Sequence, residues 1–445
     1  MKKPGRSRSI RWPKTWRKSL WVIPGLGLLV KFIIIAQIPG NGWLGADGEN
    51  YLEGLEFLIR DGFLSQERIL HYWPAGYPLL MWVLGAPNHQ LILPIMGVLQ
   101  SILFAFSTAY FGQKLQQTAL RKFSLPSVFV LTISPTLALN TIAIGYELIS
   151  ASIFLIVLGL FIDLKGTEKP RLFDIRLITM GLLFSLNSFV QPRFLLSAFL
   201  FFVLAGYFIY EKRLVLPVVA IGMICSLLLP SILIVRNVLA NDFTTISTNL
   251  GITMRIGAGE GATGGYVPGF AGVECPSFEG NAAEVDQSIV RCTIDWYLDN
   301  PSEVLRLSWN KSIYFWSPWF GPLANGSMAR NPWLKLNPFY DVATQTKEGF
   351  DFVYGDIGKL VSWLWLMGYL GAMTLGAIRL RKHSAPGKEL VVLISTLIIA
   401  NWLVSLGTLG DHRQRLPILT MVIFLQIVGI FSIKRSSKRT PQKKR

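Results

Sequence analysis

The fold is decided by residues 194–210, which read FLLSAFLFFVLAGYFIY without a single charged side chain. At a rise of 1.5 Å per residue, a helix of this length crosses most of a hydrocarbon core of about 30 Å. Residues 20–38 and 417–433 have the same apolar character. The chain of 445 residues is 51% hydrophobic and only 16% charged, whereas soluble domains are about 25% charged. We therefore expect an all-α polytopic membrane protein, and a soluble enzyme is excluded.

Hydropathy windows predict a bundle of about ten transmembrane helices. They cover residues 20–38, 91–112, 123–140, 146–164, 177–190, 194–210, 214–237, 358–378, 389–408 and 415–433. The first run lacks a convincing small-residue cleavage site, so we expect a retained helix and not a signal peptide. No internal repeat is evident in the sequence, which disfavours a transporter built from inverted halves.

Basic residues indicate how the chain is oriented. Of the 43 Lys and Arg residues, 28 lie before residue 20 or within 113–122, 165–176, 211–213, 379–388 and 434–445, and these segments hold only three of the 26 acids. Cytoplasmic loops of membrane proteins carry such an excess of positive charge. The net charge of +17 is therefore interpreted as a topology signal, and no nucleic-acid partner is expected. We expect a multi-pass protein of a bacterial plasma (inner) membrane, with both termini cytoplasmic.

This orientation divides the chain into four parts. Residues 1–237 form an N-terminal transmembrane module whose first exterior loop is 39–90, and residues 238–357 form a mostly helical exterior loop domain. Residues 358–433 supply the C-terminal transmembrane helices, and 434–445 form a basic cytoplasmic tail. Loops as long as the two exterior ones are more often functional than connecting.

The exterior domain contains two of the three cysteines, Cys275 and Cys292. An oxidising exterior compartment would permit a disulfide between them. Two free thiols are the alternative that the sequence leaves open.

Two acids on the exterior face are candidate catalytic groups. Asp47 follows the first span within the sequence GADGENYL at 45–52, and Glu147 opens the fourth span. A carboxylate at the mouth of a helix bundle could accept a proton from a hydroxyl group or bind a divalent cation. The simpler role for Asp47 is to cap the helix that follows it. If the loop folds back, His71 could join Asp47 and Glu49 around a metal ion.

Several arginines are expected on the same face. Arg193 lies between the fifth and sixth spans, Arg236 ends the seventh, and Arg413 and Arg415 open the last. Guanidinium groups that converge on one point can bind a phosphate through paired N–H donors. Each arginine could instead snorkel or cap helix carbonyls.

A set of short motifs carries a resemblance to a known family. In chain order they are DGENYL at 47–52, WPAGYPLL at 73–80, RN at 236–237, STNLG at 247–251, ATGGY at 262–266, FWSP at 315–318 and RQRLP at 413–417. The sequence resembles the GT-C membrane glycosyltransferases, in the branch related to protein mannosyltransferases and the lipid A aminoarabinose transferase. The commoner closing motif has Tyr where this chain has Gln414, and His412 lies beside it.

The resemblance implies a GT-C-like bundle in which Asp47 is the catalytic base or positions the acceptor, supported by Glu147. From the same pattern, Glu49 and Tyr77 are predicted to contact substrate. The arginines named above are predicted to hold the donor phosphate.

These features favour a glycosyltransferase that uses a lipid-linked donor. Nucleotide sugars are charged and cytoplasmic, and the glycine-rich residues 257–261 lack a P-loop lysine, so no nucleotide cofactor is expected. A polyprenyl-phosphate-linked hexose or pentose could reach the exterior face and be transferred, with inversion, to a hydroxyl of a lipid, glycan or protein. The alternatives are a polysaccharide polymerase or ligase, and a lipid or glycan transporter or flippase.

Overall fold

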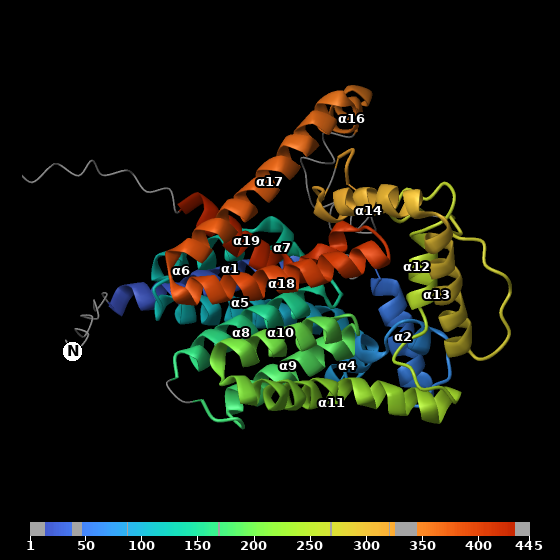
Figure 1. Ribbon diagram of the computed structural model, residues 1–445, viewed down its shortest axis with the longest axis horizontal. Coiled ribbons are helices and arrows are strands. Elements are labelled where there is room, and N and C mark those ends of the chain that lie inside the picture. The colour runs from blue at the N-terminus through green and yellow to red at the C-terminus, as the bar shows by residue number, and fades with distance from the viewer. Residues whose placement is uncertain are drawn as a thin grey trace, which may run out of the picture.

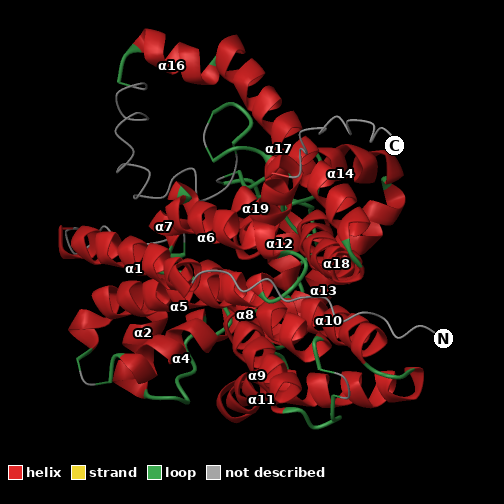
Figure 2. Ribbon diagram, turned by 90° about the vertical axis from the view of Figure 1, so that its left-hand side faces the viewer, coloured by secondary structure: helices red, strands yellow, loops and turns green. Residues whose placement is uncertain are grey.

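The computed structural model describes residues 14–37, 47–86, 88–167, 170–267, 269–319, 321–324 and 345–431. Within these ranges the chain is helical, and its nearest approach to a sheet is an isolated parallel bridge between Gly265 and Gly410 (Figure 2). The helices of the first half are α1 (Lys14–Gln37), α2 (Gly48–Asp61), α3 (Ile69–Tyr72), α4 (Gly76–Leu84), α5 (Ile92–Gln116), α6 (Ser124–Ile133), α7 (Pro135–Asn140), α8 (Glu147–Lys165), α9 (Ile175–Val190) and α10 (Phe194–Ile209). Those of the second half are α11 (Val215–Asn241), α12 (Leu250–Ile256), α13 (Ala282–Asp299), α14 (Pro301–Trp316), α16 (Lys347–Tyr354), α17 (Asp356–His383), α18 (Ala385–Gly407) and α19 (Leu416–Phe431).

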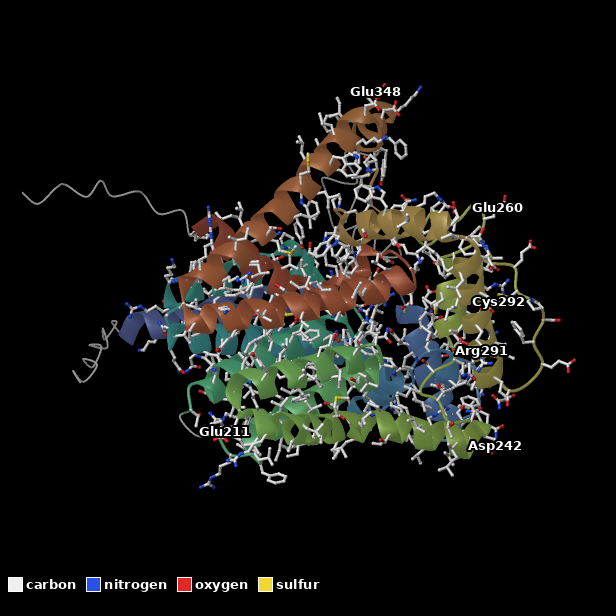
Figure 3. All side chains as sticks on the ribbon, viewed as in Figure 1. Glu211, Asp242, Glu260, Arg291, Cys292 and Glu348 are labelled. Carbon is white, nitrogen blue, oxygen red and sulfur yellow. A yellow bond between two sulfur atoms is a disulfide. The ribbon has the colours of Figure 1, made fainter. Side chains whose placement is uncertain are left out.

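The long helices form a bundle with two different ends (Figure 1). Helices α2, α12, α13 and α14 gather at one of them, called here the loop-domain end. Glu211 and Asp242, which flank α11, lie at opposite ends of the bundle, with Asp242 at the loop-domain end (Figure 3). Helices α12, α13 and α14, which belong to the predicted exterior domain, therefore lie at one end of a helical membrane bundle.

Nine of the ten predicted spans correspond to single apolar helices. Seven helices among the described residues are long and apolar enough to cross a membrane, and α9 and α10 are shorter apolar helices. The exception is 123–140, which is divided into α6 and α7 at Ser134. Pro135 explains the break, because proline has no backbone N–H and restricts the residue before it to an extended conformation.

Helices α8 and α19 form the centre of the bundle. Both are buried along most of their length, and α8 packs against α5, α9 and α19. At the periphery, α1 and α17 turn apolar side chains outward, including Leu26 (59% exposed) and Leu364 (56% exposed). An outward apolar face is expected where the solvent is lipid.

Helix α17 approaches α19 closely because two glycines lie at their contact. A side chain on Gly376 would collide with the backbone of Leu425, and one on Gly429 with the backbone of Ala372. Small residues permit such close backbone approach between transmembrane helices, whose association depends on packing.

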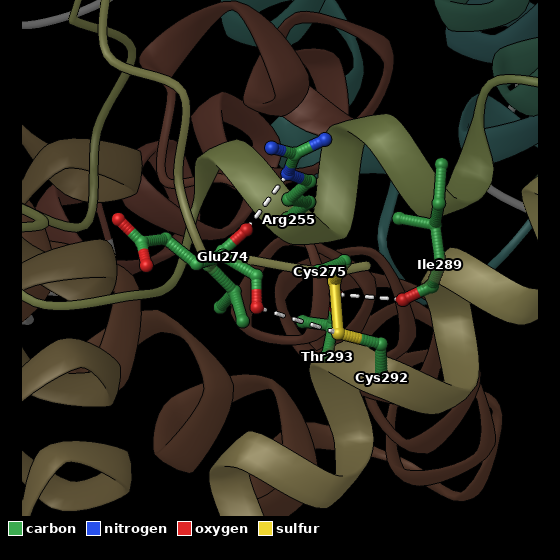
Figure 4. Close-up of a disulfide and its surroundings, with 7 residues drawn as sticks. Arg255, Glu274, Cys275, Ile289, Cys292 and Thr293 are labelled. Carbon is green, nitrogen blue, oxygen red and sulfur yellow. Dashed lines mark hydrogen bonds between the residues drawn. A yellow bond between two sulfur atoms is a disulfide. The ribbon is translucent and has the colours of Figure 1, made fainter. Parts of the chain in front are cut away.

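The loop domain is stabilised by a disulfide between Cys275 and Cys292 (Figure 4). The bond joins the segment before α13 to α13 itself. Close by, Nε of Arg255 donates to the carbonyl oxygen of Val273 at 2.8 Å, which ties the end of α12 to the same segment. Of the two possibilities that the sequence left open, the structure has the disulfide and not two free thiols.

Candidate active site

Three charged side chains from distant parts of the sequence meet at the loop-domain end. Nη1 of Arg413 lies 2.5 Å from Oδ2 of Asp47, and its Nε donates to Oε1 of Glu147. Asp47 precedes α2, Glu147 begins α8, and Arg413 lies in the 3-10 turn before α19. Asp47 and Glu147 were expected on the same face of the membrane, and in the structure a single guanidinium group joins them.

This cluster is largely removed from solvent. The side chains of Asp47, Glu147 and Arg413 are 16%, 8% and 11% exposed. Desolvating two carboxylates is costly unless a cation and further hydrogen bonds compensate, and here they share one cation.

Asp47 does not act as a conventional helix cap. It occupies the N-cap position of α2, yet its side chain makes no capping hydrogen bond, and its carboxylate is paired with Arg413 instead. The simpler role considered from the sequence is therefore not the one that its side chain performs.

Glu147 is held in place by a contact from the first loop. The hydroxyl of Tyr77 accepts a hydrogen bond of 3.0 Å from the backbone N–H of Gly145, two residues before Glu147. Tyr77 begins α4 next to Gly76, where a side chain would collide with the carbonyl of Phe189. The Gly-Tyr pair thus packs α4 against α9 and fixes the turn that carries Glu147.

This arrangement corrects the role predicted for Tyr77. Its side chain is completely buried, so it has no surface to offer a substrate and is a positioning residue. Its ring contacts that of Tyr51, with centroids 4.7 Å apart. Burial, with the charge of Asp47 adding to it, raises the pKa of Tyr51 well above its usual range, so this neighbour of the cluster is a neutral phenol.

Arg193 lies beside the cluster with donors to spare. Its guanidinium carbon is 5.6 Å from the ring centroid of Tyr146, and that of Arg413 is 5.7 Å from the same ring. Nε and Nη2 of Arg193 are buried and have no hydrogen-bond partner among the described residues. Buried donors without partners carry a desolvation cost, and an anionic ligand would remove it.

Arg236 and Arg415, by contrast, are bound to protein carbonyls. Nε of Arg236 donates to Phe63 at 3.0 Å, and its Nη1 lies 3.3 Å from the carbonyl oxygen of Leu70. Nη1 and Nη2 of Arg415 donate to Phe315 and Ser317 at 2.8 and 2.9 Å.

Both side chains are fully buried. Arg415 is also surrounded by aromatic rings, of which Tyr369 is the nearest at 5.0 Å. We therefore assign these two arginines a structural role in place of the predicted phosphate contact.

The residues considered for a metal site are not assembled into one. Nδ1 of His71 lies 3.1 Å from Oγ1 of Thr248, Glu49 is exposed on α2, and Asp47 is paired with Arg413. Among the described residues, no three His, Cys, Asp or Glu side chains form a group that could hold a metal ion. A divalent cation here would have to compete with Arg413 for the carboxylates, so the side chains as arranged do not fit one.

A lysine that the sequence analysis did not select connects the loop domain to the cluster. Nζ of Lys311 donates to the hydroxyl of Tyr297 at 2.8 Å and to the carbonyls of Leu406 and Thr408 at 3.0 and 2.7 Å. The two carbonyls belong to the segment that leads into Arg413. Burial lowers the pKa of Lys311 to about 7.

Lys311 occurs in a mixed polar and apolar segment, and no pattern there indicates that its side chain is buried. Tyr146 was missed for the same reason. Only the tertiary packing of the helices reveals either residue.

Comparison with known proteins gives structural similarities alone. No family model matches the sequence, and no curated protein sequence matches it. The apo oligosaccharyltransferase of Archaeoglobus fulgidus is similar with a TM-score of 0.49 and 13% identity, over 94% of this chain and 50% of that one. The same organism's oligosaccharyltransferase AglB, in complex with an inhibitory peptide and a dolichol-phosphate, has a TM-score of 0.46 and 12% identity over the same shares. This chain thus spans about half the length of these structures.

Proposed function

We propose that the protein is a membrane glycosyltransferase that moves a sugar from a polyprenyl-phosphate donor to an acceptor hydroxyl, with the active site at the cluster of Asp47, Glu147 and Arg413. The observation that carries the proposal is the position of Arg193. Nε and Nη2 of Arg193 are buried and lack a partner among the described residues, and Arg193 contacts the same tyrosine ring as Arg413, which pairs the two carboxylates. The site therefore offers both an anion-binding group and a proton acceptor. Transfer of a glycosyl group from a phosphate requires these two functions.

The location favours a lipid-linked donor. The cluster lies where α2, α8 and α19 begin, at an end of an apolar bundle. A donor anchored by a polyprenyl tail stays in the bilayer while its phosphate reaches this depth. A soluble nucleotide sugar would gain nothing from a site built into the end of membrane helices.

In the proposed reaction, the acceptor hydroxyl oxygen attacks the anomeric carbon of the donor. The bond between this carbon and the phosphate oxygen breaks, and its electron pair leaves with polyprenyl phosphate. The hydroxyl proton passes to the carboxylate of Asp47. A positioned base contributes about 10²–10⁴-fold to such a step, and a single displacement inverts the configuration at carbon.

The arginines stabilise the leaving group in this scheme. Arg193 binds the phosphate, because charge-assisted hydrogen bonds to a fixed guanidinium group are strong in a site that excludes water. Arg413 shares its donors between the two carboxylates, and the donor phosphate competes for them. Glu147 keeps Arg413 in place when Asp47 turns toward the acceptor.

The test is to incubate purified protein with a panel of polyprenyl-phosphate hexoses and pentoses, with and without candidate acceptors. We expect polyprenyl phosphate to be released in step with a glycosylated product of inverted anomeric configuration. Movement of an intact lipid-linked sugar across a vesicle membrane without product would identify a flippase. Growth of a preassembled chain would identify a polymerase, and either result would contradict the proposal.

A further inference from the structure

A groove with a volume of about 900 Å³ opens in the loop domain, away from the charged cluster. Its walls are the segment 260–263, one side of α13 and α14, and residues 322–323. The polar and aromatic side chains that line it include Trp296, Asn300, Glu303, Arg306, Asn310 and Tyr314.

Helix α14 turns a distinct face to this groove. Glu303, Arg306 and Asn310 recur at helical spacing and line the groove, whereas Leu307 and Lys311 point into the core. A third face exposes Leu305 (75%) and Trp309 (65%). The polar side chains on the groove face are therefore distinct from the exposed apolar face of the same helix. The apolar face could contact lipid, whereas the groove face is not built for such a contact.

The charges of the groove disfavour an anionic ligand. Arg306 is paired with Glu303, with Nη2 and Oε2 2.5 Å apart, and it also donates to the carbonyl of Ala262 at 3.0 Å. Glu260 adds a further negative charge on the rim. Among the described residues that line the groove, Arg306 is the only cation and it is already paired, so these residues suit an uncharged ligand.

We propose that this groove binds a neutral saccharide, which serves as the acceptor glycan. The role as acceptor rests on the proposed function, whereas the binding itself does not. Saccharides present hydroxyl groups that pair with amide and carboxylate side chains, such as those of Asn300, Asn310 and Glu303. Their C–H faces pack against aromatic rings, which Trp296 and Tyr314 provide. An extended peptide commonly adds to the edge of a sheet, and the groove is lined by helices and a glycine-rich turn.

Hydrogen bonds connect the groove walls to the segment that precedes Arg413 of the charged cluster. The segment 260–263 continues into Gly264, whose carbonyl oxygen accepts a hydrogen bond of 2.8 Å from the N–H of Gly410. Lys311 follows the groove residue Asn310 and binds the same 406–410 segment. A saccharide in the groove would therefore contact residues next to those that are hydrogen-bonded to the 406–410 segment, which precedes Arg413 in the chain.

The experiment measures binding of neutral tetrasaccharides, namely maltotetraose, cellotetraose, mannotetraose and chitotetraose, to the detergent-solubilised full chain by saturation-transfer NMR and calorimetry, without any donor. We expect at least one to bind with a Kd of about 1 mM or tighter. Trp296→Ala should weaken this binding about tenfold. Trp309→Ala is the matched control, because it removes the same side chain from the exposed face of the adjoining helix.

Three results would overturn the inference. These are no binding of any tetrasaccharide, equal loss in both tryptophan variants, or binding of neutral peptides that Trp296→Ala abolishes. With an active assay, Trp296→Ala should raise KM for a saccharide acceptor and leave kcat unchanged. Asp47→Asn should bind the saccharide normally. Saccharide binding therefore tests the groove, and transfer activity tests the catalytic cluster, independently of each other.

Discussion

Both ends of the bundle carry acids paired with basic side chains, and they differ in how the charges are matched. At the end opposite the loop domain, Asp163 lies 2.9 Å from Lys114 and 3.7 Å from Arg176, and Arg176 lies 2.7 Å from Asp174. Two cations and two acids balance there. At the loop-domain end, Arg413 pairs with two carboxylates, while Nε and Nη2 of Arg193 have no partner within the described part of the chain.

The difference separates a structural network from a reactive one. The balanced pairs are between 13% and 33% exposed, and pairs near solvent contribute roughly 1 kcal/mol or less each. The cluster at the loop-domain end is 8–16% exposed, with two carboxylates on one guanidinium group, and Nε and Nη2 of the nearby Arg193 have no partner among the described residues. Such an arrangement is unfavourable for stability alone, so a ligand that completes it is the simplest explanation for it.

The largest effect is expected from Arg413→Gln, because Arg413 is the side chain that pairs with both Asp47 and Glu147. We expect the free energy of unfolding to fall by about 3–5 kcal/mol, measured by denaturant titration of the detergent-solubilised protein. Arg176→Gln is the control at the opposite end, with a loss of roughly 1 kcal/mol. Equal losses would show that the two ends are not energetically different.

Arg193→Gln should reduce kcat/KM for the lipid donor by about 10²-fold, the scale for removing one fixed donor to a developing charge. Thermal stability should be unchanged or higher, since an unpaired buried guanidinium group disappears. Arg193→Lys should restore part of the activity, because it keeps the charge but not the planar donor pair. A variant that is destabilised but handles the donor normally would make Arg193 structural.

Lys311 predicts a pH dependence in the loop domain. Its pKa is about 7 in the folded protein against 10.5 for an ordinary lysine, so the unfolded chain binds more protons between these values. Stability therefore rises with pH across this window. The wild type should gain roughly 2 kcal/mol relative to Lys311→Met between about pH 7 and pH 9. If thermal unfolding gave the same stability difference between the wild type and Lys311→Met at about pH 7 and at about pH 9, this linkage would be contradicted.

The smallest effect is expected from Lys114→Gln at the opposite end. It removes one partly exposed ion pair, so stability should change by roughly 1 kcal/mol or less, and transfer activity should stay within about twofold of the wild type. A large loss of activity in a well-folded Lys114→Gln protein would mean that the opposite end also takes part in the reaction.

The sequence predicted the architecture better than the contacts. Apolar runs located nine of the ten spans, because lipid forces a continuous apolar helix. The remaining span, 123–140, is divided at Pro135, and hydropathy windows do not resolve such a break. Asp47 and Glu147 were placed on one face, but no pattern indicated that Arg413 would bridge them.

The roles of the arginines could not be predicted from the sequence either. Arg236 and Arg415 have the same local appearance as Arg193, and Nε of Arg415, like that of Arg193, has no partner among the described residues. What distinguishes Arg236 and Arg415 is the set of carbonyls that accept their other hydrogen bonds. Those carbonyls come from residues far away in the chain, so the distinction exists only in the folded protein.

The most direct measurement compares Asp47→Asn with Asp163→Asn, the same change at the two ends of the bundle. Each variant would be assayed for transfer from the accepted polyprenyl-phosphate sugar, with monodispersity in detergent as the test of folding. We expect turnover to fall by roughly 10²-fold or more in Asp47→Asn, on the scale of a lost general base, and to stay near normal in Asp163→Asn. Near-normal turnover by a well-folded Asp47→Asn protein would contradict the assignment of the active site.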